Sequence, residues 1–368
     1  MKILIIFGTR PEAIKMAPLV LRLRQDLDVK VCVTGQHREM LDQVLKLFQI
    51  IPEYDLDLMK PNQNLANLTG EVLNGVTHIL QQEKFDWVIV QGDTTSTMSA
   101  AMAAFYKKVL VGHVEAGLRT YNLGSPFPEE LNRQVTSKMA RLHFAPTAES
   151  EQNLLKEGFS KKTIRITGNT VSDALHWVLQ HTTQVDVTLP FDLQQFRIIL
   201  VTGHRRENFG EGFQQICEAL QTIALQQPDV QIVYPVHLNP NVLEPVNRIL
   251  SNLPNMHLLE PLEYPQFVHL MNQSALILTD SGGVQEEAPS LGKPVLVMRD
   301  TTERPEAVQA GTVKLVGANQ RTIVDETIRL LNDSEAYRKM AFAHNPYGDG
   351  TASNKIMDAL MSFEKDNR

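Results

Sequence analysis

The sequence has few cysteines, and it lacks long apolar runs. Only Cys32 and Cys217 occur among 368 residues, each within an apolar run and without a metal-ligand or redox pattern nearby. Two unpaired thiols are typical of a reducing compartment. The apolar run before Gly8 is too short for the core of a signal peptide, and no run approaches the roughly 18 residues of a membrane-spanning helix. We therefore expect a cytoplasmic protein without a membrane partner.

The charge balance and the missing motifs exclude further classes. The formal net charge is -7, which disfavours a nucleic-acid partner because such proteins normally present a basic face. The first predicted strand is not followed by G-x-G-x-x-G, so a dinucleotide site is disfavoured. No HExxH or clustered His/Cys set suggests zinc. We expect no metal and no cofactor, although a local cationic pocket for phosphates is compatible with this composition.

Short apolar runs alternate with longer helical patterns along the chain. In the first half the predicted strands are Ile3–Phe7, Val29–Thr34, Asp86–Gln91, Val109–Val114 and Leu142–Ala145. In the second half they are Ile198–Thr202, Gln231–Pro235, Met256–Leu259, Leu276–Thr279, Val295–Met298 and Val313–Val316. Continuous apolar strands separated by helices indicate parallel sheets covered on both faces. The polar stretch Thr183–Gln195 between the halves predicts a linker, so we expect an α/β protein with two doubly wound domains.

Ligands of open parallel sheets bind beyond the carboxyl ends of the strands, so the residues there are the candidates for chemistry. Gly8-Thr9-Arg10-Pro11-Glu12 follows the first strand, and Thr9 and Glu12 have the spacing of a capping box. A helix start with Arg10, and Lys15 about one turn later, predicts an anion site. A well-capped surface helix with an unrelated arginine is the alternative.

Two strand-end loops of the second half are rich in glycine or in cations. Asp280-Ser281-Gly282-Gly283 precedes a helix pattern, which is typical of a phosphate-binding turn, and Glu287 lies where it would meet ribose hydroxyls. His204 and Arg205 lie in TGHRREN, and Arg304 in RDTTERPEA. These cations predict stabilisation of a diphosphate. The alternatives are a capped glycine turn for Asp280-Ser281-Gly282-Gly283, a solvent-exposed run of charges for TGHRREN, and a weak surface ion pair for Arg304.

Acidic residues follow strands of the first half. Asp93 lies in QGDTTST, Glu115 in HVEAGLRT, and Glu129 opens a helix that also carries Arg133. Taken alone, Asp93 and Glu129 are more typical of helix caps or first-turn carboxylates. Glu115 lies between an apolar strand and Ala116, so we expect it to be partly buried. Burial raises the pKa of a carboxyl group and suits general acid–base chemistry.

Together these motifs resemble the non-hydrolysing UDP-N-acetylglucosamine 2-epimerases. The matching segments are FGTRPEAIKMAPL, QGDTT, GHVEAGLRT, FPEELNR, ITGNTVSDAL, TGHRREN, PVHLNP, TDSGGVQEEAPSLGKPVLVMRDTTERPEA and HNPYGDG. The resemblance implies a glycosyltransferase-B architecture, with two Rossmann-like domains and the nucleotide sugar held between them. We place the first domain at 1–170 plus a returning helix at 352–368, and the UDP-binding domain at 171–351. The resemblance also implies a homodimer.

The resemblance implies three sets of site residues. The catalytic set is Asp93, Glu115, Glu129, Arg133 and His204. The substrate-binding set is Arg10, Lys15, Leu262, Phe267, Ser281, Gly282, Gly283, Glu287 and Arg304. A second UDP-N-acetylglucosamine site, which activates some bacterial members, matches Gln36, Arg205 and His237. One departure is visible, because Leu262 stands where some members have Gln beside the uracil.

The implied reaction interconverts UDP-N-acetylglucosamine and UDP-N-acetylmannosamine, which feeds cell-surface polysaccharide synthesis. The C2 hydrogen of the sugar is not adjacent to a carbonyl group, so direct deprotonation is unfavourable. Elimination of UDP to a 2-acetamidoglucal, followed by re-addition, avoids this barrier and moves no hydride. A glycosyltransferase of the same fold and a non-catalytic nucleotide-sugar sensor are the competing interpretations.

Overall fold

The continuous apolar runs of the sequence form buried parallel strands in the computed structural model, which describes residues 1–35, 38–58, 63–182 and 187–366. The chain folds into two units. Unit 1 comprises Met1–Ala174 with Tyr347–Arg368, and unit 2 comprises Leu175–Pro346. The first boundary lies inside helix α7 (Thr170–His181). The polar stretch predicted as the linker, described from residue 187, lies within unit 2.

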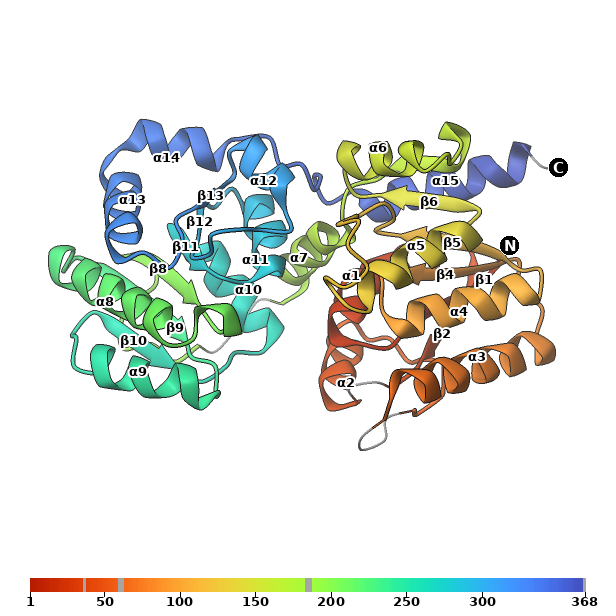
Figure 1. The fold of residues 1–368 in the computed structure, drawn as a ribbon, viewed down its shortest axis with the longest axis horizontal. Helices are drawn as coiled ribbons and strands as arrows, with labels where there is room; N and C mark the ends of the chain where they lie inside the picture. Colours follow the sequence, from red (N-terminus) through yellow and green to blue (C-terminus); the bar gives the residue numbers. More distant parts are fainter. Residues whose placement is uncertain (36–37, 59–62, 183–186, 367–368) are drawn as a thin grey trace. The chain divides into compact units, whose positions relative to one another are not determined.

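Unit 1 contains a seven-stranded parallel sheet with the order β3-β2-β1-β4-β5-β6-β7 (Figure 1). Its strands are β1 (Lys2–Phe7), β2 (Asp28–Val33), β3 (Tyr54–Asp55), β4 (Trp87–Gln91), β5 (Leu110–Val114), β6 (Leu142–Ala145) and β7 (Ile164–Ile166). The central strands are buried on both faces, as their unbroken apolar sequences require.

Helices cover both faces of this sheet. They are α1 (Arg10–Leu23), α2 (Arg38–Leu47), α3 (Leu65–Gln82), α4 (Thr95–Tyr106), α5 (Glu129–Met139), α6 (Ala148–Lys156) and α15 (Ala352–Asp366), with a short 3-10 turn at Lys161–Thr163. Helices α3, α4 and α5 pack side by side on one face, while α1 contacts α2 and α15 on the other (Figure 1).

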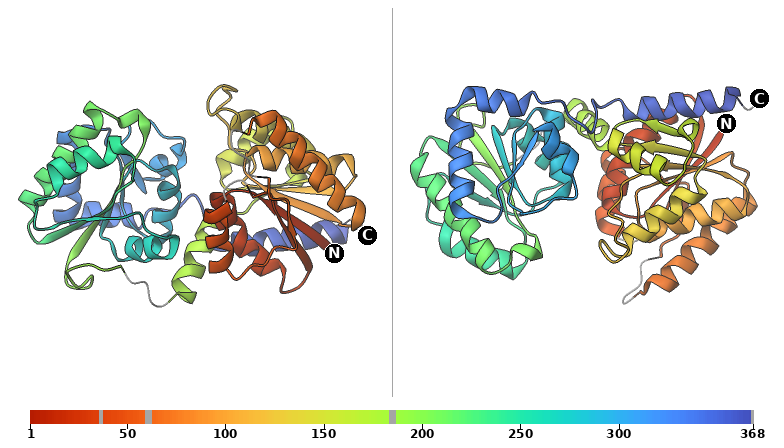
Figure 2. Two further views of the ribbon diagram at one scale, coloured as in Figure 1. Left: turned by 90° about the horizontal axis from the view of Figure 1, so that it is seen from below. Right: turned by 45° about the horizontal axis from the view of Figure 1, so that its top comes forward.

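The last helix returns to unit 1, although it follows unit 2 in the sequence. Asp173 accepts hydrogen bonds from the backbone N–H groups of Ala352 and Ser353 at 3.1 and 2.8 Å, which caps the start of α15. At its other end, Phe363 meets the ring of Trp87 edge to face with centroids 5.2 Å apart. Figure 2 shows α15 lying along unit 1.

Unit 2 contains a six-stranded parallel sheet with the order β10-β9-β8-β11-β12-β13. Its strands are β8 (Arg197–Thr202), β9 (Val230–Pro235), β10 (Met256–Leu259), β11 (Leu276–Thr279), β12 (Val295–Val297) and β13 (Val313–Leu315). Its helices are α8 (Glu211–Gln226), α9 (Pro240–Leu250), α10 (Tyr264–Gln273), α11 (Gly282–Glu287), α12 (Pro305–Ala310), α13 (Gln320–Asn332) and α14 (Ser334–Ala341), with 3-10 turns at Arg206–Asn208 and Ala288–Leu291.

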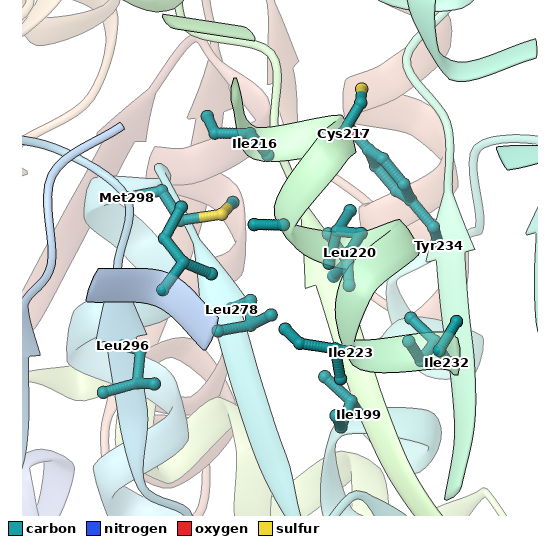
Figure 3. Close-up of a cluster of buried hydrophobic side chains, with 14 of the residues drawn as sticks. Ile199, Ile216, Cys217, Leu220, Ile223, Ile232, Tyr234, Leu278, Leu296 and Met298 are labelled. Atoms are coloured by element: carbon teal, nitrogen blue, oxygen red, sulfur yellow. The ribbon is translucent and has the colours of Figure 1, made fainter. Parts of the chain in front are cut away.

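The core of unit 2 lies between helix α8 and the sheet. Figure 3 shows side chains of α8 packed against those of β8, β9, β11 and β12. The residues involved include Ile199, Ile216, Cys217, Leu220, Ile223, Ile232, Leu278 and Leu296, all fully buried. Burial of this apolar surface fixes the strands from which the polar loops of the unit emerge.

Both sheets have a point at which the strand order reverses. In unit 1 the chain leaves β1 on one side toward β2 and returns on its other side as β4, and in unit 2 the strands β8 and β11 stand in the same relation. At such a point adjacent strands send their following loops to opposite sides, which leaves a crevice at the carboxyl edge. The α/β doubly wound class predicted from the sequence is confirmed. No described helix is both long and apolar enough to span a membrane.

Candidate functional site

The turn between β1 and α1 approaches the rest of unit 1 closely. A Cβ atom added to Gly8 would lie 2.0 Å from Oγ1 of Thr34, so only glycine fits there. The predicted capping box is confirmed, because Thr9 and Glu12 bond each other's backbone N–H groups. The half-buried Arg10 follows, and it has no ion-pair partner among the described residues. This turn therefore presents an uncompensated cation at the switch point of the sheet.

Glu12 is buried and joins this turn to the next strand-end loop. Its Oε2 accepts from the backbone N–H groups of Gly8 and Thr9 at 3.0 and 2.8 Å. Its Oε1 accepts from the hydroxyl groups of Thr94 and Thr97 at 2.7 and 2.9 Å. The two oxygens of one carboxylate thus hold the Arg10 turn and the Asp93 turn in a fixed relation.

Asp93 lies in the turn between β4 and α4. Its carboxylate forms an ion pair with Arg133 of α5, and the amide of Asn132 donates to the backbone carbonyl of Asp93 at 2.9 Å. Burial raises the pKa of the Asp93 carboxyl, while the charges of Arg133 and Lys15 offset part of this effect. Asp93 is therefore held rigidly and is easier to protonate than an exposed aspartate.

Glu115 follows β5 and adopts a left-handed backbone conformation with φ of 61°. Its Oε2 lies 2.5 Å from Nζ of Lys15 and 3.2 Å from Nδ2 of Asn169, and its side chain is 9% exposed. A glutamate with positive φ is uncommon, and such conformations concentrate at functional sites. The expected partial burial of Glu115 is confirmed, and the structure adds a cation and an amide as its donors.

Glu129 begins α5 and is half-buried, and its charge acts on Asp93. Its neighbour Glu130 is fully buried instead, and accepts from the backbone N–H groups of Thr120 and Tyr121, both at 3.0 Å. The structure therefore gathers five of the predicted side chains of unit 1. These are Lys15, Asp93, Glu115, Glu129 and Arg133.

The loop after β8 carries the predicted cations of unit 2. The hydroxyl of Tyr234 donates to the carbonyl of Gly203 at 2.9 Å. Oδ2 of Asp280 accepts from the backbone N–H groups of His204 and Arg205, both at 2.8 Å. Because these bonds fix the backbone of the loop, they also fix the points from which the His204 and Arg205 side chains project.

The glycine loop after β11 lies beside Arg205. The backbone N–H of Ser281 donates to Oγ1 of Thr279 at 2.9 Å, and Gly282 follows. A Cβ atom built on Gly282 would lie 3.5 Å from Nη2 of Arg205, so the guanidinium group faces this backbone. Gly283 is exposed next to it. A glycine backbone beside a cation is an arrangement that suits phosphate oxygens.

The remaining predicted contacts of unit 2 lie on three other segments of the unit. Arg304 forms an ion pair with Glu286, so its charge is already partly compensated. Glu287 is buried at the end of α11, Leu262 precedes α10, and the half-buried Phe267 lies on α10. The role of Leu262 and Phe267 as uracil contacts stays a prediction.

His237 and His204 lie together at the ends of β9 and β8. Their rings are stacked with centroids 5.4 Å apart and an interplanar angle of 16°. Arg205 lies against the glycine loop, while His237 lies against His204, the chain neighbour of Arg205. Gln36, the third residue of that set, lies outside the described residues. Within the described part of the chain, no group of three or more His, Cys, Asp or Glu side chains is arranged to hold a metal.

Sequence reasoning missed several buried polar residues behind the site. His113 lies in β5, fully buried, with Nε2 2.8 Å from the carbonyl of Gly92. Burial lowers the pKa of His113 to about 3, so the ring is neutral and donates this bond. Asn169 was also missed, and Asp280 was named only as the first residue of the glycine motif, without a role. The signal available in the sequence was a polar residue within or beside an apolar strand. That signal does not show which residue the polar group contacts.

The two parallel sheets, with charged loops at their carboxyl edges, define an α/β protein of glycosyltransferase-B-like fold. Residues 20–361 match the family model of UDP-N-acetylglucosamine 2-epimerase, and the chain belongs to this family. The Escherichia coli K12 UDP-N-acetylglucosamine 2-epimerase is 59% identical over 371 residues, which cover 98% of this chain and 99% of that protein. An epimerase is an isomerase, so the chain belongs to a family of isomerases.

Solved structures agree in fold over the whole chain. The Neisseria meningitidis UDP-GlcNAc 2-epimerase bound to UDP-GlcNAc is 53% identical, with a TM-score of 0.88 over 98% of this chain and 100% of that one. The Methanocaldococcus jannaschii UDP-GlcNAc 2-epimerase in complex with UDP-GlcNAc and UDP is 32% identical, with a TM-score of 0.77 over 98% of this chain and 100% of that one.

Proposed function

We propose that this protein interconverts UDP-N-acetylglucosamine and UDP-N-acetylmannosamine by inverting C2 of the sugar. Family membership supports the substrate and the outcome. The observation that carries the proposal is the cluster of carboxylates and cations at the switch point of unit 1, where Glu115 meets Lys15 and Asp93 meets Arg133. Such paired charges provide proton donors and acceptors around one bound ring.

The proposed reaction is an elimination followed by re-addition. A base removes the proton from C2, and the electrons of the C2–H bond form the C1–C2 double bond. The C1–O bond breaks at the same time, and its electron pair leaves with UDP. The product pair is UDP and a 2-acetamidoglucal. UDP then adds back to C1, and an acid delivers a proton to the opposite face of C2. Charge, atoms and electrons balance without an external oxidant or reductant.

The carboxylates of unit 1 are proposed to move these protons. Asp93, Glu115 and Glu129 provide the base and the acid for the two faces of C2. Burial raises the pKa of Asp93, so its carboxyl group takes up a proton more readily than an exposed aspartate would. Glu115 suits the base, since its carboxylate is oriented by Lys15 and Asn169. Arg133 positions Asp93 through their ion pair.

The cations and the glycine loop are proposed to bind UDP and stabilise it as it departs. Arg10 of unit 1 has no ion-pair partner among the described residues and is available to a phosphate. In unit 2, the backbone of Ser281, Gly282 and Gly283 is proposed to bind the diphosphate, and His204 to stabilise the charge that develops on it. Glu287 is proposed to contact the ribose and Arg304 a phosphate. Leu262 and Phe267 are proposed to lie beside the uracil.

Activation by a second molecule of UDP-N-acetylglucosamine is a separate proposal on Gln36, Arg205 and His237. Because Arg205 also faces Gly282, its removal is expected to affect both binding events. Sigmoidal forward kinetics support this proposal. A reverse reaction that starts without any added UDP-N-acetylglucosamine contradicts it. A homodimer, a cytoplasmic location and supply of N-acetylmannosamine to surface polysaccharides are proposed with the same function.

Proton NMR of the protein with UDP-N-acetylglucosamine in heavy water tests the reaction. We expect deuterium at C2 and appearance of the 2-epimer, with UDP retained in the products. Free UDP together with a new glycosidic bond, formed only when an acceptor is added, would indicate a transferase. Binding without any exchange would indicate a sensor.

Two conservative variants test the assignment of the carboxylates. Glu115→Gln and Asp93→Asn keep the shape of each side chain, and we expect each to lower turnover by at least about 100-fold, the usual contribution of general acid–base catalysis. Glu149→Gln, an exposed carboxylate in the first turn of α6, is the matched control and should keep wild-type turnover. Wild-type turnover in both test variants, with intact folding, would contradict the assignment.

A further inference from the structure

Asp280 has one carboxylate oxygen without a hydrogen-bond partner in the part of the chain that the structure describes. The side chain is fully buried, and this oxygen is Oδ1. A buried polar atom without a partner costs about 1 to 3 kcal/mol or more, so it is rarely retained without a reason. Oδ1 lies 3.6 Å from Nδ1 of His204. The atom that lacks a partner therefore faces the imidazole ring.

The rest of Asp280 is fully engaged. Its Oδ2 accepts from the backbone N–H groups of His204 and Arg205, and the amide of Asn208 lies 3.5 Å away. Tyr234 holds the carbonyl of Gly203 in the same loop. Because the carboxylate and the loop backbone are both fixed, the ring of His204 is the part that is able to turn toward Oδ1. Its side chain is 42% exposed, which leaves room for that rotation.

The present separation is too long for a hydrogen bond, which requires about 2.8 Å between the heavy atoms. A change in the side-chain torsions of His204 brings the ring closer by somewhat less than about 1 Å, without any movement of the backbone. The closed pair would place an N–H of the imidazole on the buried carboxylate. Its other nitrogen, Nε2, would then point away from Asp280.

We infer that Asp280 is a positioning residue for His204. Its Oδ1 accepts a hydrogen bond from Nδ1–H of the ring, which fixes that tautomer and leaves Nε2 to face the diphosphate of the ligand. This inference rests on the proposed function, since it assigns a partner to the histidine that meets the departing UDP. In the free protein the neutral ring carries its proton on Nδ1. When the diphosphate binds, Nε2 gains a proton, and the resulting imidazolium lies between the carboxylate and the phosphate oxygens.

The charged and titratable groups around His204 act in opposite directions. Burial lowers the pKa of His204, Asp280 raises it, and both His237 and Arg205 lower it. The net direction is a lowered pKa, so the free ring is neutral at pH 8. Asp280 is the group in this set that favours the imidazolium. An incoming diphosphate adds a second such group, so UDP binding is expected to take up a proton.

NMR of the full chain labelled with 15N-histidine tests the inference directly. The ring nitrogen shifts at pH 8 report the tautomer, and the signals of His204 are assigned by their loss in His204→Gln. We expect the wild type to carry the proton on Nδ1. In Asp280→Asn the side-chain oxygen still accepts from the loop backbone, while the NH₂ group faces Nδ1. The proton should therefore move to Nε2, and the midpoint of the His204 titration should fall by about 1 pH unit or more.

Tyr234→Phe is the matched control. It removes a bond to the same loop but leaves the carboxylate of Asp280, so the wild-type tautomer and midpoint should persist. A wild-type ring protonated on Nε2 would overturn the inference, as would an unchanged midpoint in folded Asp280→Asn. If that variant does not fold, the wild-type tautomer alone decides. The ring nitrogen shifts and the titration midpoint do not depend on turnover. A failure of the epimerase proposal is therefore recognised separately, by the absence of deuterium at C2.

Discussion

Nζ of Lys15 lies 2.5 Å from Oε2 of Glu115, although 100 positions separate the two residues in the sequence. Lys15 comes from the first helix, and Glu115 from the turn after β5. Both side chains are largely buried, with 13% and 9% of their surface exposed. The pair therefore ties two strand-end segments of unit 1 together through one short, weakly hydrated contact.

Removing one partner of this pair should destabilise the protein. In Lys15→Met the Glu115 carboxylate keeps only part of its compensation, and we expect the free energy of unfolding in urea to fall by about 3 kcal/mol. The double variant Lys15→Met/Glu115→Gln should cost clearly less than the sum of the single variants. The exposed pair Arg321 and Asp325 is the control, and its coupling should stay below about 0.5 kcal/mol. An equally small coupling for Lys15 and Glu115 would contradict this prediction.

Replacing Glu12 with glutamine should lower the free energy of unfolding less than replacing it with alanine. In Glu12→Gln the oxygen is able to stay on the N–H groups of Gly8 and Thr9, while the NH₂ group meets threonine hydroxyls that also accept hydrogen bonds. We expect a loss of about 1 kcal/mol in unfolding free energy. Glu12→Ala leaves the same donors without an acceptor and should cost about 3 kcal/mol.

The control for the Glu12 series is Glu149→Ala, because this carboxylate is exposed in the first turn of α6. Its unfolding free energy should change by no more than about 0.5 kcal/mol. Equal losses in Glu12→Gln and Glu12→Ala would show that the hydrogen bonds of Glu12 do not hold the two turns.

His113 should make stability depend on pH below its ordinary titration range. Its pKa is lowered from 6.5 to about 3 in the folded protein, so between these values only the unfolded chain binds the proton. The stability that this group contributes is present above pH 6.5 and is lost as the pH falls toward 3. One such proton corresponds to about 1.4 kcal/mol per pH unit.

The variant His113→Gln removes that proton while its amide remains able to donate to the carbonyl of Gly92. Unfolding free energies measured at pH 6 and pH 4.5 should therefore differ by about 2 kcal/mol less in the variant than in the wild type. His143, another buried histidine with a lowered pKa, is present in both proteins and cancels in the comparison. Parallel pH profiles for the two proteins would refute the prediction.

Gly8→Ala should strain the first turn through one identified contact. The added Cβ would meet Oγ1 of Thr34 at 2.0 Å, and we expect a loss of about 2 to 3 kcal/mol in unfolding free energy. Adding Thr34→Ala removes that oxygen, so the double variant should recover part of the loss. Gly70→Ala is the control, because its new Cβ in helix α3 would meet nothing within 4 Å apart from its chain neighbours and the backbone of its own helix, and it should be neutral or stabilising. Failure of Thr34→Ala to rescue would disprove the contact.

The sequence pattern predicted most strands closely. Leu142–Ala145, Met256–Leu259 and Leu276–Thr279 are strands with the predicted bounds. The short strands Tyr54–Asp55 and Ile164–Ile166 were missed, because each contains a charged residue and so lacks the continuous apolar run that marked the other strands.

The sequence by itself determined where the strands and helices lie and which loops carry charge, because apolar periodicity, capping residues and glycines act over a few neighbouring positions. The tertiary structure decided which charges meet. It alone pairs Glu115 with Lys15, Asp93 with Arg133 and Arg304 with Glu286, and brings the buried Oδ1 of Asp280 close to His204. These relationships depend on the order of strands in each sheet, which is set by packing between segments distant in the chain and has no local signature.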